Sequence, residues 1–422
     1  MPLFSAASSA PSSDAPPSDL PPAATGGDGA DGTARPPLWL PSPYLVLGGL
    51  LWAVLSAAAW QAPLCCEAGL QAAVVERLRV NLLHPAFPMT DLPAVASAHY
   101  SPYALLQGLA ARATRLSGPS VVAVAASVNL LLLLTGIGRL TRLLTPNRWV
   151  PVLVLVPLPL IHWADPARWS APSTFAVAVT LHLWAWTGRA AARTPRPGDP
   201  KPGRTPRWAE AAVIGVLLGL VLLVHPPTAI GAAIGCVALI AVRTRTRIRP
   251  TVWRWAFAVV CAVAVAALWP YYNGLTAPRT PAEGRTTGPP ATEGVRAAGE
   301  PYAWATAYVP PGEVVLTDSR PAMYALAGHG AYVLADALPD AGLARAERRE
   351  RSRAVAAYLD ASTPQARRDG ITARYGVRWL LLTRFQHLPE NATMLAFSSA
   401  TGEVLARVPA GGAPSDVLEG SG

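Results

Sequence analysis

Charged residues are scarce in this chain. Asp, Glu, Lys and Arg together make up 14% of its 422 residues, and the mean hydropathy is +0.29, whereas soluble domains usually carry about a quarter charged residues. Between residues 44 and 272 the only carboxylates are Glu67, Glu76, Asp91, Asp165, Asp199 and Glu210. This deficit excludes an ordinary soluble enzyme and indicates a lipid environment.

Lysine and cysteine are also nearly absent. Lys201 is the only lysine, so the net charge of +10 comes from arginines, which lie between apolar runs rather than on one face with polar and aromatic readers. We therefore expect no nucleic-acid partner. The four cysteines form no CxxC pair. The sequence thus predicts neither a disulfide framework nor a cysteine-based zinc site.

Seven apolar runs follow one another along the chain. They cover residues 44–60, 120–137, 149–163, 173–187, 208–224, 228–242 and 253–272. Several are shorter than the roughly 17–25 residues that cross a bilayer core, and prolines interrupt the third. The third and fourth runs therefore either span the membrane or form a re-entrant hairpin. Either alternative leaves the number of crossings odd.

Basic residues predict the orientation. Three groups of loop and flanking residues carry fourteen Arg and Lys residues, whereas the loop between the third and fourth runs carries only Arg168. Because cytoplasmic loops retain positive charge, the N-terminus is expected inside and the last 150 residues outside. The stretch 208–242 is too long for one span and is expected to fold back at His225-Pro226-Pro227-Thr228.

These patterns predict an α-helical integral protein of the plasma membrane, with about seven spans and a C-terminal extracytoplasmic α/β domain. The expected parts are a disordered cytoplasmic tail (1–42), a membrane region (43–272) with an outer loop (61–119), a linker (273–300), the α/β domain (301–410) and a disordered tail (411–422).

Two segments of the outer loop have helical spacing. Ala68 to Leu83 places Leu70, Val74, Leu78 and Leu82 on one face, with Glu67, Glu76, Arg77 and Arg79 off it, and Tyr103 to Leu116 is also amphipathic. We expect two helices that lie along the membrane surface.

The C-terminal part alternates between strand and helix patterns. Strands are expected over 313–318, 331–335 and 377–383, helices over 321–327, 344–361 and 364–375, and a hairpin over 397–408. This order favours a small, mainly parallel sheet, on which ligands bind at the carboxyl ends of strands. Asp318 lies at such an end, or alternatively caps the next helix. Five arginines cluster near the start of the 344–361 helix.

The architecture resembles the GT-C superfamily of membrane glycosyltransferases. Short phrases similar to actinobacterial members are Leu83-His84-Pro85, Tyr100-Ser101-Pro102-Tyr103, Pro172-Ser173-Thr174-Phe175-Ala176 and Val224-His225-Pro226-Pro227-Thr228. The resemblance implies transfer of a sugar from a polyprenyl-phosphate carrier to a cell-envelope glycan on the outer face. The carrier-linked sugar is then a substrate, and no cofactor is expected.

In such enzymes an acidic residue soon after the first span acts as general base. Glu67 is the positional match, where the family usually has Asp, and Asp91 is expected to bind the acceptor or to serve as the alternative base. Asp318 is the acceptor-binding candidate of the outer domain. Cations and hydrogen-bond donors for the lipid phosphate are expected among Arg77, Arg79, Arg168, His84, His99 and His225. The outer loop has no DxD pair, so no metal is expected.

Non-functional interpretations stand beside these assignments. Glu67 can simply complement a helix N-terminus, and His225-Pro226-Pro227 can be a turn that satisfies backbone groups. For the whole chain, the alternative to an enzyme is a non-catalytic, membrane-anchored protein that binds glycan or assists envelope assembly. A secondary transporter is disfavoured because the sequence has no internal repeat.

Overall fold

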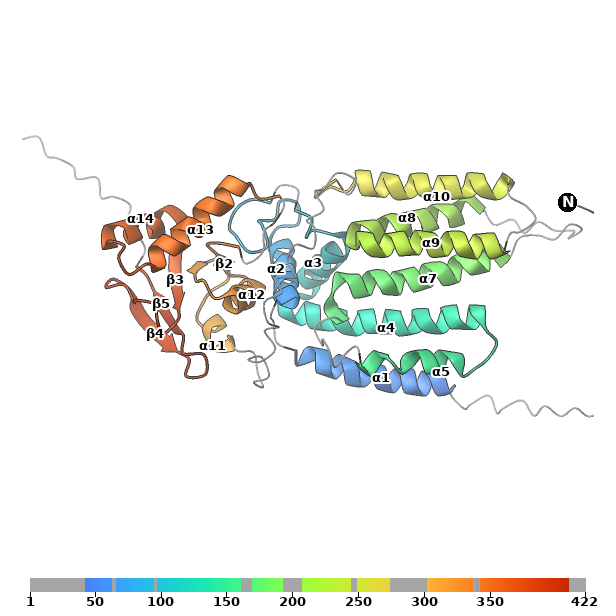
Figure 1. The fold of residues 1–422 in the computed structure, drawn as a ribbon, viewed down its shortest axis with the longest axis horizontal. Coiled ribbons are helices and arrows are strands. Elements are labelled where there is room, and N and C mark those ends of the chain that lie inside the picture. Colours follow the sequence, from blue (N-terminus) through green and yellow to red (C-terminus); the bar gives the residue numbers. More distant parts are fainter. Residues whose placement is uncertain are drawn as a thin grey trace, which may run out of the picture. The chain divides into compact units, whose positions relative to one another are not determined.

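A computed structural model of the chain is mostly helical, with a small sheet in its C-terminal region (Figure 1). It describes residues 42–62, 66–94, 97–160, 169–192, 207–243, 249–273, 302–336, 340 and 342–409. The two tails and the linker expected from the sequence lie almost wholly outside these residues, as does Arg168.

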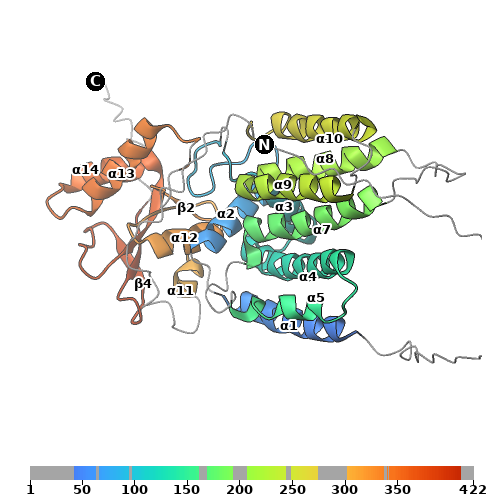
Figure 2. The ribbon, with the colours of Figure 1, turned by 45° about the vertical axis from the view of Figure 1, so that its right-hand side comes forward.

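The described part of residues 42–273 consists of helices and the segments that connect them. The helices are α1 (Pro43–Trp60), α2 (Cys66–Val80), α3 (Pro102–Thr114), α4 (Gly118–Leu144), α5 (Val150–Leu155), α7 (Pro172–Ala192), α8 (Arg207–Val224), α9 (Pro226–Arg243) and α10 (Arg249–Ala267). Helix α4 packs on α7, α7 on α9 and α8 on α10, and both views show these helices side by side (Figures 1 and 2).

Each of the seven apolar runs contains a helix, but their lengths differ. In the described residues, α1 and α4 are long and apolar enough to cross a bilayer, whereas the apolar helices 150–160, 208–224, 226–242 and 253–267 are shorter. Helix α1 also exposes large apolar side chains: Leu45, Val46, Leu50, Trp52, Val54 and Trp60. Two helices, not seven, thus meet the criterion for a membrane span.

The third and fourth runs behave differently from each other. In the third, α5 covers six residues and the chain turns at Val156-Pro157 before residues 158–160 resume a helix. The missing N–H of proline favours such an interruption. The fourth run lies within α7, one helix of 21 residues, which is about 31 Å long at 1.5 Å per residue. The fourth run is therefore part of one continuous helix.

The expected fold-back at His225 is confirmed. Helix α8 ends at Val224 and α9 begins at Pro226, so His225 alone separates them. Helix α8 then packs closely on α10 through two glycines one turn apart. A Cβ at Gly215 or Gly219 would overlap the backbone carbonyl of Ala258 or Ala262. Such small residues let the backbones of apolar helices approach each other.

The C-terminal region is an α/β unit, as expected. Its elements are α11 (Ala303–Thr306), β1 (Val314–Leu316), α12 (Arg320–Gly328), β2 (Tyr332–Val333), α13 (Arg345–Leu359), α14 (Gln365–Tyr375), β3 (Val377–Leu382), β4 (Thr393–Phe397) and β5 (Val404–Arg407). The strand order is β2-β1-β3-β5-β4, with parallel pairing among the first three and antiparallel pairing elsewhere. Leu316, Leu380 and Leu382 pack under Val355 and Tyr358 of α13.

Helix α2 departs from the expectation of an exposed amphipathic helix. Every residue from Ala68 to Leu78 is buried, and the helix packs against α3, α4 and α12. Glu76 and Arg77, expected off the apolar face, are only 3% and 4% exposed. Gly69 permits the contact with α12, because a Cβ there would lie 2.8 Å from the Tyr324 carbonyl oxygen. The surface-helix prediction is wrong for α2, which joins the helical region to the α/β region.

Candidate functional site

A pocket of about 130 Å³ lies beside the start of α2. Four of its residues, Glu67, Leu70, Gln71 and Val74, come from α2, and His99, Ser101, Ala104 and Pro172 complete the lining. The α2 residues are spaced i, i+3, i+4 and i+7, which places them on one helix face. Segments far apart in sequence therefore meet where α2 begins.

Glu67 is the carboxylate of this pocket. It is exposed and lies in the first turn of α2, where the helix dipole favours its charged form. A charged carboxylate facing a small pocket can accept a proton from a bound hydroxyl. The same interaction with the helix dipole is expected if Glu67 only stabilises the start of α2 and has no catalytic role.

His99 brings an imidazole to the same pocket. Its Nε2 lies 3.8 Å from Oδ2 of Asp340, which also accepts a hydrogen bond from the Ser97 hydroxyl at 2.7 Å. The Gly342 N–H donates to the other oxygen of Asp340 at 2.8 Å. Burial lowers the pKa of His99, and the charge of Asp340 opposes this effect. The carboxylate of the α/β region thus lies where it can orient a histidine of the outer loop.

Gln71 connects the pocket to a buried polar network. Its side-chain nitrogen donates to Oε1 of Gln107 at 2.8 Å, and both side chains are buried. Nearby, Asn129 donates to the Tyr103 hydroxyl at 2.7 Å, and that hydroxyl donates to the Ser170 carbonyl at 3.0 Å. These contacts fix α3 to α4 and to the segment before α7, so one wall of the pocket is held by side-chain hydrogen bonds.

Asp91 does not line this pocket. Its Oδ1 forms an ion pair with the Arg351 guanidinium of α13 at 2.8 Å, and Arg351 also binds Glu347 at 2.8 Å. Asp91 therefore ties the outer loop to the α/β region. The structure does not bring the two predicted catalytic carboxylates, Glu67 and Asp91, together in one described pocket.

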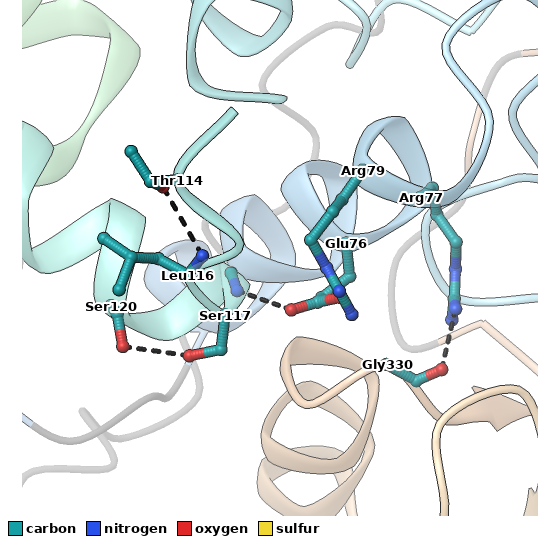
Figure 3. A network of polar contacts seen from close by, with 9 residues as sticks. Glu76, Arg77, Arg79, Thr114, Leu116, Ser117, Ser120 and Gly330 are labelled. Atoms are coloured by element: carbon teal, nitrogen blue, oxygen red, sulfur yellow. Dashed lines mark hydrogen bonds and ion pairs between the residues drawn. The ribbon is translucent and has the colours of Figure 1, made fainter. Parts of the chain in front are cut away.

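Arg77 contacts the backbone of three residues. Its guanidinium donates to the carbonyls of Pro88 at 3.2 Å, Gly330 at 2.8 Å and Ala331 at 2.5 Å. Figure 3 shows the contact with Gly330. The guanidinium also lies over the ring of Tyr332, 3.7 Å from its centroid. Burial lowers the pKa of Arg77. These contacts occupy all three nitrogens of the guanidinium and leave little of it for a lipid phosphate.

Arg79 is half-exposed and pairs with Glu76. Its guanidinium lies 2.6 Å from Oε2 of Glu76, while the other oxygen of Glu76 accepts the Gly118 N–H at 2.5 Å. Figure 3 shows this carboxylate directed at the start of α4. Glu76 thus complements the α4 N-terminus. Of the two α2 arginines, Arg79 is the more accessible to a phosphate.

Two predicted histidines lie in turns. His84 is exposed after α2, and its backbone N–H donates to Oδ1 of Asn81 at 3.1 Å. His225 caps α9, because its Nδ1 accepts the Thr228 N–H at 3.3 Å and lies 2.7 Å from the Thr228 hydroxyl. The alternative in which His225 satisfies backbone groups at a turn agrees with this geometry.

Asp318 follows β1, as expected, but does not cap α12. The N-cap residue is Ser319, and Asp318 accepts a hydrogen bond from the Gln386 side chain at 2.7 Å. Asp318 is exposed at the carboxyl end of the sheet and remains a candidate for contact with an acceptor. In the described part of the chain, no group of three or more His, Cys, Asp or Glu residues is arranged to hold a metal ion.

Sequence reasoning missed Ser97 and Asp340. Asp340 lies in a short segment before α13, far along the chain from His99. No local pattern links the two residues, because a pairing over such a distance arises only from tertiary packing. Their contact with His99 requires α2 and the outer loop to pack against the α/β region.

Comparison with known proteins gives no match: no protein-family description, no curated protein and no solved structure is similar to this chain.

Proposed function

We propose that this chain is a multi-pass protein of the plasma membrane that transfers a sugar from a polyprenyl-phosphate carrier to a cell-envelope glycan. The observation that supports this best is the pocket in which Glu67 and His99 meet beside Gln71 and Ser101. A proton acceptor and an imidazole in a small, partly apolar pocket form a suitable site for deprotonating a sugar hydroxyl.

Membrane insertion is supported by the apolar helices. Helix α1 carries exposed leucine, valine and tryptophan side chains along its length, which lipid accommodates better than water. Helices α8 and α9 have 18 residues each, about 27 Å at 1.5 Å per residue. The proposal keeps an odd number of crossings, about seven, with the N-terminus inside and the α/β region outside, as the basic residues favour.

The proposed reaction is a single displacement. The acceptor hydroxyl attacks the anomeric carbon, and Glu67 takes its proton as the new C–O bond forms. The bond between the anomeric carbon and the carrier oxygen breaks, and its electron pair leaves with polyprenyl phosphate. Attack opposite to the leaving group inverts the anomeric centre. Among the predicted phosphate ligands, Arg79 and His84 are accessible groups of the outer loop that can bind the phosphate.

The size of the pocket limits what it holds. Its 130 Å³ is less than the roughly 300–1,000 Å³ of a typical small-molecule site. It is therefore too small for both substrates at once and holds only the reacting part of the acceptor. The carrier lipid would lie outside the pocket, along the apolar helices.

The alternative function is non-catalytic glycan binding or envelope assembly. It is favoured by the structural use of Arg77 and Asp91, both of which hold the helical and α/β regions together. Under this alternative, Glu67 stabilises the start of α2 and the pocket performs no chemistry. The two functions differ in whether the folded wild-type protein transfers sugar and, if it does, whether transfer needs the carboxylate at position 67.

Sugar transfer by the purified full chain in lipid nanodiscs tests the proposal. The assay uses a panel of polyprenyl-phosphate sugars with envelope extract as acceptor, and compares the wild type with Glu67→Gln and Asp91→Asn. We expect Glu67→Gln to lose about 10²–10⁴-fold in turnover, and Asp91→Asn to retain most of it. Absence of turnover from folded wild type with every donor would support the non-catalytic alternative. Equal turnover in Glu67→Gln would instead show sugar transfer that uses another base, Asp91 or Asp165.

A further inference from the structure

Helices α13 and α14 enclose a groove in the α/β region. Its volume is about 420 Å³, and it is lined by Glu350, Arg353, Ala354 and Ala357 of α13 and by Arg367, Gly370, Ile371, Arg374 and Tyr375 of α14. On each helix the first four of these residues are spaced i, i+3, i+4 and i+7. Each helix therefore contributes one continuous face.

Four arginines of the two helices differ in their surroundings. Arg351 and Arg368 are buried and hold the fold, because Arg351 pairs with Asp91 and Arg368 donates to the Tyr358 carbonyl at 3.1 Å. Arg353 and Arg367 are exposed, line the groove and have no polar side-chain partner among the described residues. Arg353 and Arg367 are therefore available to a ligand in the groove.

The remaining charges make the groove cationic. Arg374 pairs with Glu350 at 2.5 Å, the one acidic residue of the lining, which leaves Arg353 and Arg367 without a counter-charge there. Arg367 and Arg374 are seven residues apart on α14, a separation of about 10 Å along the helix at 1.5 Å per residue. A chain that carries repeated anionic groups can contact both.

The floor of the groove is apolar and open. Ala354, Ala357 and Ile371 contribute short side chains, and a Cβ added at Gly370 would have no atom within 4 Å. The volume lies within the roughly 300–1,000 Å³ of small-molecule sites. The floor can thus hold the carbon skeleton of a chain while the arginines bind its charges.

We propose that the α13–α14 groove binds a segment of an anionic glycan that carries carboxylate or phosphate groups. The guanidinium fork binds either group through paired hydrogen bonds. The concave shape favours an extended chain over a lipid surface, which would meet the arginines only at the rim. This binding site is distinct from the Glu67 pocket and does not depend on sugar transfer.

Binding of labelled chains to the full-length protein in detergent tests this proposal. The probes are oligogalacturonate for carboxylate groups, polyphosphate for phosphate groups and dextran as the neutral chain. The test variants are R353Q/R367Q and Gly370→Trp, which places an indole in the open space above the floor. The matched controls are R345Q/R349Q, which removes the same charge from exposed α13 positions outside the groove, and Gly370→Ala.

We expect the wild type to bind an anionic chain but not dextran. R353Q/R367Q should weaken binding at least about tenfold because it removes paired charge-assisted hydrogen bonds. Gly370→Trp should weaken binding to a similar extent because the indole fills the space that the chain would occupy. R345Q/R349Q and Gly370→Ala should remain within about twofold of the wild type, because exposed substitutions away from the groove have small effects. Gly370 lies inside a helix, where either replacement has a higher helix propensity.

Three results would overturn the proposal. Equal weakening by the two double variants would indicate general electrostatic attraction, and full binding by Gly370→Trp would place the ligand outside the groove. Binding to anionic phosphatidylglycerol vesicles, without binding to either anionic chain, would indicate a lipid surface. Thermal unfolding of each variant confirms that the fold is retained.

Discussion

At the scale of single residues, the buried charged side chains of α2 stabilise the fold by binding backbone groups of the protein. Arg77 binds the carbonyls of Pro88, Gly330 and Ala331, and Glu76 binds the first N–H of α4. An amphipathic pattern counts such residues as exposed because it considers only their polarity. Their real partners come from segments that the pattern does not include.

Replacement of Arg77 by Met should strongly destabilise the protein. Three buried carbonyls would lose their donor, at about 1–3 kcal/mol for each buried group left unsatisfied, so we expect a loss of at least about 3 kcal/mol in the free energy of unfolding. Arg77→Lys should retain only part of this stability, because the ammonium group of lysine lacks the planar set of donors that the guanidinium provides. Thermal unfolding in detergent measures the effect. Arg112→Met, at an exposed position of α3, is the control, and an equal effect there would contradict this account.

Asp336 should make stability depend on pH. Burial, with a smaller effect of Asp340, raises its pKa from 3.8 to about 7, so between these values the folded state binds a proton that the unfolded state does not. The contribution of Asp336 is therefore full below pH about 4 and is lost as the pH rises through about 7, on the order of 4 kcal/mol. We expect Asp336→Asn to be less stable relative to wild type at pH 4.5 than at pH 8. A difference between the two proteins that does not change with pH would contradict the shift.

At the scale of elements, the sequence predicts the α/β region better than the outer loop. The helices 344–361 and 364–375 correspond to α13 and α14, and the strand 377–383 corresponds to β3, because alternating apolar periods and turn residues act locally. The parallel pairing of β1 with β2 and β3 agrees with the expected mainly parallel sheet, but β3, β5 and β4 pair antiparallel, so the sheet is mixed. Burial of α2 was not predictable, since it depends on α12, which lies more than 200 residues further along the chain.

The α8–α9 turn offers a test of the role of His225. His225→Ala removes the cap of α9 and should cost about 1 kcal/mol in the free energy of unfolding, whereas His225→Ser supplies another capping oxygen and should cost less. Burial lowers the pKa of His225, and protonation of Nδ1 removes the acceptor. The contribution of the cap is therefore present at neutral pH and is lost as the pH falls below the histidine range.

Stability and sugar transfer of these two variants should be measured together. If His225 only caps the helix, His225→Ser retains turnover. Loss of turnover in a stable His225→Ser protein would place His225 in the donor site instead.

At the scale of the whole molecule, the candidate site lies where the helical and α/β regions meet. Glu67 could be found from its position after the first apolar run. The contact of His99 with Asp340 could not be found in this way, because the two residues lie far apart in the sequence and are brought together by tertiary packing. The same contacts explain why Asp91, a second acidic residue of the outer loop, forms an ion pair at this junction instead of lining the pocket.

Reporter fusions test the proposed orientation. Alkaline phosphatase, which is active only outside the cytoplasm, should be active when fused after Pro409 and inactive when fused after Arg243. β-Galactosidase at the same positions should give the opposite result, since the basic loops favour a cytoplasmic location for residue 243. Activity of alkaline phosphatase after Arg243 but not after Pro409 would invert the topology and place the Glu67 pocket on the cytoplasmic side.

Chemical rescue of Glu67→Ala tests most directly whether the carboxylate at position 67 is the base. Truncation leaves space beside a pocket of about 130 Å³, into which formate fits as a replacement carboxylate. We expect Glu67→Ala to lose about 10²–10⁴-fold in sugar transfer, and added formate to restore a saturable part of it without affecting the wild type. Turnover in Glu67→Ala equal to that of the wild type, or a loss that formate does not relieve while the variant remains folded, would contradict this role.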